Sequence, residues 1–251
     1  MNYSIMVPSR KRPQLLINLI HTINETVEDK TNVEVIIAYD FEDHLTIEAL
    51  NTIKSKNYLF AINQVGRSRS PNINNDYYNW MATNFTNGKY LIAINDDTIF
   101  KNYAWDSMAL KKIDKFLENK KDDIFYGITT DGEIERKRNE HNFFTCFPLI
   151  SKSAVTALGF FFDPSFYKDG ADWDIILPYK HINRVLDLRS EIIIEHISVR
   201  SGRRTKDILD CECISPESSS AGYPRLGANL NKHSTILSNY IQNKLNDELN
   251  K

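Results

Sequence analysis

Apolar, β-branched segments alternate with helix-like segments over the first 130 residues of this chain. The segments that predict strands are "YSIMVPS" (3–9), "VEVIIAYD" (33–40), "YLFAINQV" (58–65), "KYLIAIN" (89–95) and "DIFYGITT" (123–130). Helices are predicted between them, at 14–28, 47–57, 72–88 and 107–121. Gly88 is expected to cap the third of these helices. This alternation is typical of an α/β fold with a mainly parallel sheet and helices on both faces.

The pattern changes after residue 130. Further strands are predicted at 143–151, 185–188 and 191–198, and further helices at 171–181 and 232–248. Residues 205–230 are rich in Ser, Pro and Gly, which favours a loop or lid. We therefore expect one domain over residues 1–200, with halves at about 1–130 and 131–200, followed by a small C-terminal loop and helix over 201–251.

Composition limits the classes of protein to which the chain can belong. No apolar run approaches the ~20 residues of a membrane span, and the N-terminus carries basic residues too early for a signal peptide. A cytoplasmic protein is the expectation. Three cysteines, Cys146, Cys211 and Cys213, are an odd number, which argues against a disulfide framework. The C-x-C spacing of the last two is a poor zinc pattern, because zinc binds four ligands.

Charge alone does not identify a partner. The net charge is −2, so the chain has no general polyanion-binding signature. The basic residues nevertheless gather in four clusters, at 10–12, 67–69, 136–138 and 200–204. Each cluster on its own is most simply a solvated loop. If the clusters met on one face, they would suit the phosphates of a nucleotide or of a nucleic acid.

Polar residues stand at the carboxyl ends of three predicted strands: Pro8-Ser9-Arg10, Tyr39-Asp40 and Asn95-Asp96-Asp97. Ligands of open α/β sheets bind beyond these ends, so the three loops are expected to line one crevice. Aspartates are also common in turns and at helix N-termini. A second acidic group, Asp169, Asp172 and Asp174, lies around the start of the helix predicted at 171–181. Adjacent carboxylates form a hard oxygen site that suits Mg²⁺ or Mn²⁺ together with substrate phosphates.

Four segments together resemble the GT-A fold glycosyltransferases, especially the family 2-like inverting enzymes. They are "SIMVPSRKRPQLLINLI", "VEVIIAYDFED", "NGKYLIAINDDTIF" and "ALGFFFDPSFYKDGADWDIILPYK". The resemblance covers roughly residues 3–180. It implies a GT-A type, Rossmann-like nucleotide-binding fold, whose donor-binding half would be residues 1–130 and whose acceptor half would be residues 131–200.

The resemblance also implies the donor and metal sites. The family's D-x-D motif matches Asn95, Asp96 and Asp97. Asp97 would bind Mn²⁺ or Mg²⁺ beside the donor diphosphate, with Asp96 as a further possible ligand. Asn95 departs from the pattern, because the family usually has Asp there. The other residues implied in donor binding are Pro8, Ser9, Arg10, Asp40 and Arg67, with Asp40 at the nucleobase.

The later segments imply the catalytic residue. The family's Glu-Asp pair matches Ala171 and Asp172, so Asp172 would be the general base and the Glu partner is missing. His196 resembles the late histidine that completes the metal site in many GT-A enzymes, and a histidine simply packed on a strand is the alternative. Arg203 and Arg204 would pair with the phosphates if the 205–230 segment closes as a lid.

The implied function is that of a hexosyltransferase-type glycosyltransferase. It would move a sugar from a nucleotide-sugar donor, with a UDP-sugar favoured, to an acceptor hydroxyl with inversion. The acceptor would be a saccharide or glycoconjugate, or DNA with hydroxymethylated bases in a phage-infected bacterial cell. Two alternatives remain. A nucleotidyltransferase is disfavoured because "VPSRKRPQ" has no glycine. A non-catalytic sugar-nucleotide or nucleic-acid binding protein would explain the two departures from the family's acidic motifs.

Overall fold

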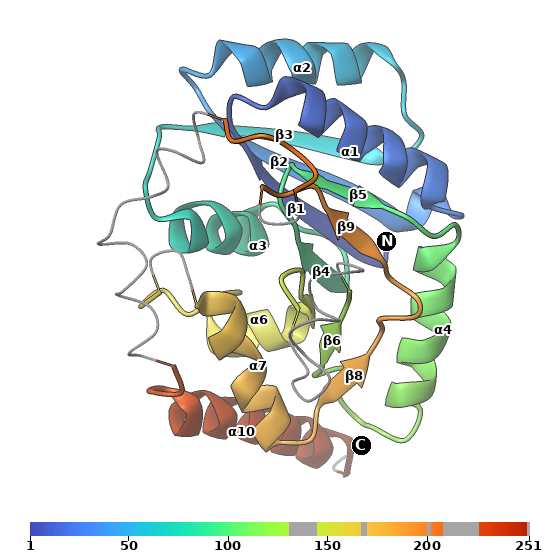
Figure 1. The fold of residues 1–251 in the computed structure, drawn as a ribbon. Coiled ribbons are helices and arrows are strands. Elements are labelled where there is room, and N and C mark those ends of the chain that lie inside the picture. The colour runs from blue at the N-terminus through green and yellow to red at the C-terminus, as the bar shows by residue number, and fades with distance from the viewer. Residues whose placement is uncertain (131–144, 167–169, 200–201, 208–225, 250–251) are drawn as a thin grey trace.

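A seven-stranded sheet forms the centre of the molecule, as the computed structural model shows (Figure 1). The structure describes residues 1–130, 145–166, 170–199, 202–207 and 226–249. In spatial order, the strands are β3 (Ala61–Arg67), β2 (Val33–Asp40), β1 (Tyr3–Ser9), β4 (Tyr90–Ala93), β7 (Leu149–Ser151), β6 (Tyr126–Ile128) and β8 (Val185–Asp187). Only the pairings of β7 with β4 and with β6 are antiparallel, so the expected mainly parallel sheet is confirmed.

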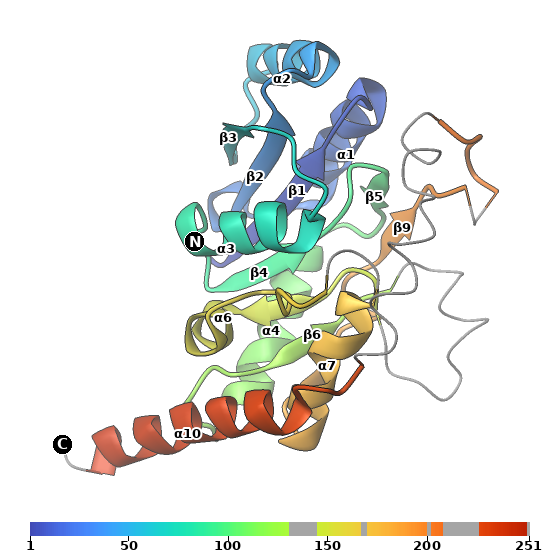
Figure 2. The ribbon, with the colours of Figure 1, turned by 90° about the vertical axis from the view of Figure 1, so that its left-hand side faces the viewer.

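Helices cover both faces of this sheet. One face is covered by α1 (Pro13–Thr26), α2 (His44–Ser55) and α4 (Trp105–Leu117). The other face is covered by α3 (Trp80–Asn84), α6 (Lys152–Leu158), α7 (Ala171–His181) and α10 (Leu230–Leu249). Figure 2 shows α10 running along one side of the molecule, next to α6 and α7.

Alternation along each central strand divides its side chains between the two faces. In β1, Ile5 and Val7 pack with α1, α2 and α4, whereas Met6 packs with the helices of the opposite face. β2 repeats this division, with Val35 on the first face and Ile36 on the second. Successive side chains of a strand point to opposite faces, and both faces are covered. The nearly continuous apolar runs in the sequence follow from this double burial.

A small second sheet pairs two segments that are far apart in the sequence. β5 (Thr98–Phe100) and β9 (Ile194–His196) are antiparallel, with Thr98 opposite His196. β5 follows directly on the acidic motif. This short sheet therefore brings the late histidine beside the carboxylates.

Several predicted elements have the expected bounds, and others differ: the strand predicted at 58–65, for example, is β3, Ala61–Arg67. β1, β2 and α7 begin and end as the sequence predicts. The helix predicted at 72–88 is a π-helical turn, Asn74–Asn79, continued by α3, which ends at Asn84. Gly88 is therefore not its cap. Its backbone N–H bonds to Ser4 Oγ at 2.8 Å, against the start of β1.

No helix in the described ranges is both long and apolar enough to cross a membrane.

The C-terminal part of the chain bears on two further predictions. α10 is the predicted last helix, and its Leu237 lies in the same buried cluster as residues of α6 and α7. The division of the chain near residues 130 and 200 stays a prediction, and residues 208–225 of the predicted lid lie outside the described residues.

The close approach of Gly88 to β1 generates a stability prediction. A Cβ at Gly88 would lie 2.6 Å from the Ser4 backbone nitrogen and from the Tyr3 carbonyl carbon, and neither atom can rotate away. Gly88→Ala should lower the free energy of unfolding by about 1–3 kcal/mol, the usual cost of overpacking, as measured by urea denaturation.

Gly66→Ala is the matched control for this prediction. A Cβ at Gly66 would meet the ring of Phe41, at 2.5 Å and 2.8 Å, and this ring is 57% exposed and free to turn. We expect a smaller loss of stability. An equal or larger loss for Gly66→Ala would contradict the assigned role of Gly88.

Candidate functional site

The carboxyl ends of three parallel strands lie level at one edge of the sheet. Ser9 is in register with Tyr39, and Asp40 is in register with Arg67, the last residue of β3. β4 lies on the other side of β1, and the chain continues from it into the acidic motif. The three polar loops that the sequence predicted to share a crevice are thus adjacent.

Asp96 is held by the loop that follows β1. The side chain is buried, and Oδ2 accepts hydrogen bonds from Ser9 Oγ at 2.9 Å and from the Arg10 backbone N–H at 3.4 Å. Arg12 Nη1 donates to Oδ1 at 3.4 Å. Burial raises the pKa of Asp96 to about 7, with a contribution from Asp97, while Arg12 and the two hydrogen bonds oppose the rise. The carboxylate therefore needs local positive charge to remain ionised at neutral pH.

Asp97 faces a different set of partners. Its Oδ1 lies 3.1 Å from His196 Nε2, and its Oδ2 lies 3.1 Å from Arg204 Nη2 and 3.6 Å from Arg12 Nη1. Burial would raise the pKa of Asp97, but His196, Arg12 and Arg204 together bring the pKa below its usual value. Asp97 is therefore ionised. A carboxylate oxygen and an imidazole nitrogen that face each other are both suitable ligands for a divalent ion.

A network of ion pairs ties the segment 202–207 to the loop after β1. Arg12 Nε donates to Asp207 Oδ2 at 2.7 Å, and Arg12 Nη2 donates to Oδ1 at 3.2 Å. Arg204 Nη1 also reaches Asp207 Oδ2, at 3.3 Å. Two of the four basic clusters thus meet at the carboxylates.

Sequence reasoning missed Arg12 and Asp207 as members of this site. Arg12 had a signal, because it stands in the cluster at 10–12, directly after a strand end. Nothing in the sequence around Asp207 indicates that it would pair with a residue at the other end of the chain.

The edge at β2 and β3 combines a carboxylate with flat side chains. Arg10 Nε lies 3.2 Å from Asp40 Oδ2, and the Tyr77 hydroxyl donates to Asp40 Oδ1. The Arg67 guanidinium lies over the rings of Tyr77 and Trp80, 4.9 Å and 5.2 Å from their centroids. Burial, together with the bond to Asp40, raises the pKa of Tyr77 to about 12. The Tyr77 hydroxyl therefore remains a neutral donor to the carboxylate.

Tyr78 lies against the start of the acidic motif. Its hydroxyl lies 2.9 Å from Asn95 Oδ1. Burial raises the pKa of Tyr78 strongly, and the charges of Asp96, Asp97 and Asp172 raise it further. Asp172 stands in the first turn of α7, and its charge contributes to this rise. Asn95, the departure from the family pattern, makes a hydrogen bond that an aspartate could also accept.

Some of the remaining predicted residues are described by the structure, and others are not. Pro8 is buried within β1, opposite Ala38. Arg203 pairs with Glu195 at 2.7 Å, whereas its neighbour Arg204 pairs with Asp97. The predicted features outside the described residues are Asp169, the basic cluster 136–138, and the pair Cys211 and Cys213.

Comparison with known proteins identifies the fold. No protein-family model and no curated protein sequence matches the chain. Among solved structures, S. aureus TarS 1–349 in complex with UDP-GlcNAc has 10% sequence identity and a TM-score of 0.65, over 96% of this chain and 72% of that one. A mannosyltransferase from Pyrobaculum calidifontis, PcManGT, in complex with GDP-Man and Mn²⁺, has 14% identity and a TM-score of 0.59, over 97% and 80%.

A third match is GalNAc-T7 with UDP, GalNAc and Mn²⁺, at 12% identity and a TM-score of 0.55, over 78% of this chain and 43% of that one. Across the TarS structures, the chain spans 43% to 74% of the matched chain. The chain therefore has the GT-A fold of these glycosyltransferases, as the resemblance in sequence implied.

The position of Tyr78 generates a prediction about the rigidity of the acidic loop. Its hydroxyl also lies 2.9 Å from the Ile94 carbonyl oxygen, and the surroundings are buried. Tyr78→Phe should lower the free energy of unfolding by about 1–2 kcal/mol, because the buried Ile94 carbonyl oxygen loses its side-chain donor. Tyr103→Phe, whose side chain is 65% exposed, should change it by less than about 0.5 kcal/mol. Equal effects in thermal denaturation would contradict this role of Tyr78.

Proposed function

We propose that this chain is a glycosyltransferase that moves a sugar from a nucleotide-sugar donor to an acceptor hydroxyl with inversion. A UDP-sugar is the favoured donor. The observation that carries the proposal is the surroundings of Asp97: one oxygen faces His196 Nε2 at 3.1 Å, and the other faces the guanidinium of Arg204 at 3.1 Å. Ligands for a cation and donors for a diphosphate thus meet at the carboxyl end of β4.

Asp97 and His196 are the residues that would hold a divalent metal. Mn²⁺ and Mg²⁺ commonly bind one or two carboxylates and complete their coordination with substrate phosphates. The buried Asp96 is adjacent, although its oxygens point to Ser9 and Arg12. When bound, such an ion supplies Lewis-acid stabilisation of the leaving diphosphate.

Arg12 and Arg204 would bind the diphosphate itself. Both guanidiniums lie at Asp97, so they stand beside the place where the phosphates would lie. Guanidinium groups match phosphate oxygens in geometry and charge. Donor binding would then let Arg12 and Arg204 exchange part of their pairing with Asp207 for pairing with the phosphates.

The edge at β2 and β3 would bind the nucleoside. Asp40 offers a carboxylate whose position is fixed by Arg10 and Tyr77, and Asp40 is the residue that the family resemblance assigns to the nucleobase. Arg67, stacked over Tyr77 and Trp80, presents a flat cation at the same edge. Such groups can stack against a planar base and donate to its carbonyl oxygens.

Asp172 would act as the general base. As the acceptor oxygen attacks the anomeric carbon, its proton passes to the Asp172 carboxylate while the diphosphate leaves with the bonding electron pair. A single displacement of this kind inverts the anomeric configuration. Asp172 is half-buried in the first turn of α7, which supports access of an acceptor hydroxyl to its carboxylate.

Nucleotide release from the donor tests this proposal. The full chain is incubated with UDP- and GDP-sugars and Mn²⁺, and free nucleotide is measured with a saccharide acceptor and with water alone. Asp97→Asn should lose metal-dependent donor binding. Asp172→Asn should bind the donor normally and turn over about 10²–10⁴-fold more slowly, as expected for loss of a general base. Asp114→Asn, exposed on α4, should behave as the unsubstituted chain.

Three outcomes would reject parts of the proposal. Donor binding without any nucleotide release would favour a binding protein, and release of pyrophosphate from nucleoside triphosphates would favour a nucleotidyltransferase. Full turnover by Asp172→Asn would remove its role as base. Hydroxymethylated DNA is tested as an acceptor in parallel. If DNA is the acceptor, its binding should weaken steeply as the salt concentration rises.

The neighbouring arginines Arg203 and Arg204 form a matched pair for a second prediction. Arg204 contacts Asp97, whereas Arg203 contacts Glu195. Arg204→Gln should weaken UDP binding in saturating Mn²⁺ by about 10-fold or more, the usual effect of losing a charge-assisted hydrogen bond. Arg203→Gln should change it by less than about threefold. Calorimetric titration that finds equal losses would contradict the assignment of Arg204 to the diphosphate.

A further inference from the structure

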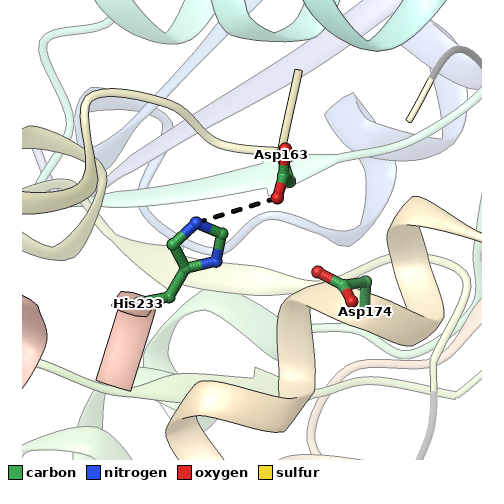
Figure 3. A group of neighbouring side chains, drawn as sticks. All are labelled: Asp163, Asp174 and His233. Atoms are coloured by element: carbon green, nitrogen blue, oxygen red, sulfur yellow. Dashed lines mark ion pairs between the residues drawn. The ribbon is translucent and has the colours of Figure 1, made fainter. Parts of the chain in front are cut away.

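A second group of potential metal ligands lies on the face of the sheet that α7 and α10 cover. It consists of Asp163, from the loop after α6, Asp174 of α7, and His233 of α10. One ligand atom from each residue lies within 4.8 Å of the other two. Figure 3 shows the three side chains directed into one space.

The two carboxylates of this group are buried. Asp163 and Asp174 are each 4% exposed, and no lysine or arginine in the described part of the chain pairs with either. Asp163 Oδ1 accepts from the Ser165 N–H at 2.8 Å, and Oδ2 accepts from Asn229 Nδ2 at 2.7 Å. Asp174 Oδ1 accepts from the Gly227 N–H at 2.8 Å. Among the described residues the hydrogen-bond donors to these two carboxylates are neutral, so a cation between the carboxylates would stabilise their ionised forms.

His233 faces the first of these carboxylates. Its side chain is 3% exposed. Nε2 lies 3.7 Å from Asp163 Oδ2, a distance too long for a hydrogen bond. Two ligands held about 2.0–2.1 Å from a tetrahedral ion lie about 3.3 Å apart, so only a small shift would let both bind one ion.

The protonation states agree with ligand binding. Burial lowers the pKa of His233, against the pull of Asp163 and Asp174, so the imidazole is neutral near pH 7. Burial opposes ionisation of Asp163, but its hydrogen bonds bring the pKa below the usual value. Burial raises the pKa of Asp174, whose ionised form a bound cation would favour.

We propose that Asp163, Asp174 and His233 bind one divalent transition-metal ion, with Zn²⁺ as the ion that the set favours. Two carboxylates and a neutral imidazole carry a charge of about −2, which the ion cancels, and Zn²⁺ takes this mixture of nitrogen and oxygen ligands with water as the fourth. The ion would join α10 to α7. Its ligand on α7, Asp174, lies two residues after Asp172. This site is independent of the proposed transferase activity.

Metal titration of the full chain tests the site without any nucleotide. Asp97→Asn is used as the background, so that the strand-end site does not contribute. After treatment with a chelator, this chain should bind one equivalent of Co²⁺, with the visible absorption of a tetrahedral complex. Zn²⁺ at about 100-fold above its dissociation constant should raise the melting temperature by about 5–10 °C.

Substitutions in the same background identify the ligands. His233→Ala and Asp174→Asn should each weaken Co²⁺ binding by more than about 100-fold. Asn229→Ala, which removes a hydrogen bond to the ligand Asp163, should weaken binding by about 10–100-fold. His21→Ala, at a histidine of α1 that is half-exposed, is the matched control and should bind normally.

Absence of Co²⁺ binding by the Asp97→Asn chain would overturn the proposal, as would unchanged binding by Asp174→Asn. Circular dichroism verifies that each variant is folded. If His233→Ala does not fold, Asp174→Asn decides the question, because it keeps the shape of the side chain.

Discussion

Two adjacent carboxylates buried at the end of β4 set the strongest constraint on this structure. Asp96 and Asp97 are each 3% exposed, and burial of an ionised carboxylate costs several kcal/mol unless it is paired and hydrogen-bonded. The side chains that pair with these carboxylates come from three separate parts of the chain. They are Arg12, His196 and Arg204. The loop after β1, the small second sheet and the segment 202–207 therefore all converge on this pair.

The parallel topology makes this convergence possible. Because β1, β2 and β3 run in the same direction in register, their terminal side chains lie level at one edge. β4 continues the same arrangement on the other side of β1. The loops after β1, β2 and β4 are supported by buried strands, so their polar groups are held by rigid elements. This edge therefore presents a carboxylate near β2 and guanidiniums beside the end of β4.

The sequence predicted those parts of the fold that depend on local patterns. β1, β2 and α7 were located because continuous apolar runs and helix-start residues are short-range signals. The grouping of strand-end residues followed from topology alone. The pairing of Arg12 with Asp207 joins residues 195 positions apart, and no local pattern records such a contact. The role of Gly88 was also hidden, because a glycine beside a neighbouring strand looks the same in sequence as a glycine that ends a helix.

The large sequence separation within the acidic site has a consequence for synthesis of the protein. Asp97 leaves the ribosome 99 residues before His196 and 107 residues before Arg204. Domains begin to fold during translation, so the strands up to β4 can assemble while only the earlier loop is present to neutralise the pair. The nascent chain would thus carry the two carboxylates without His196 and Arg204 until its last quarter emerges. The pair of carboxylates would therefore gain its full set of compensating partners only as translation ends.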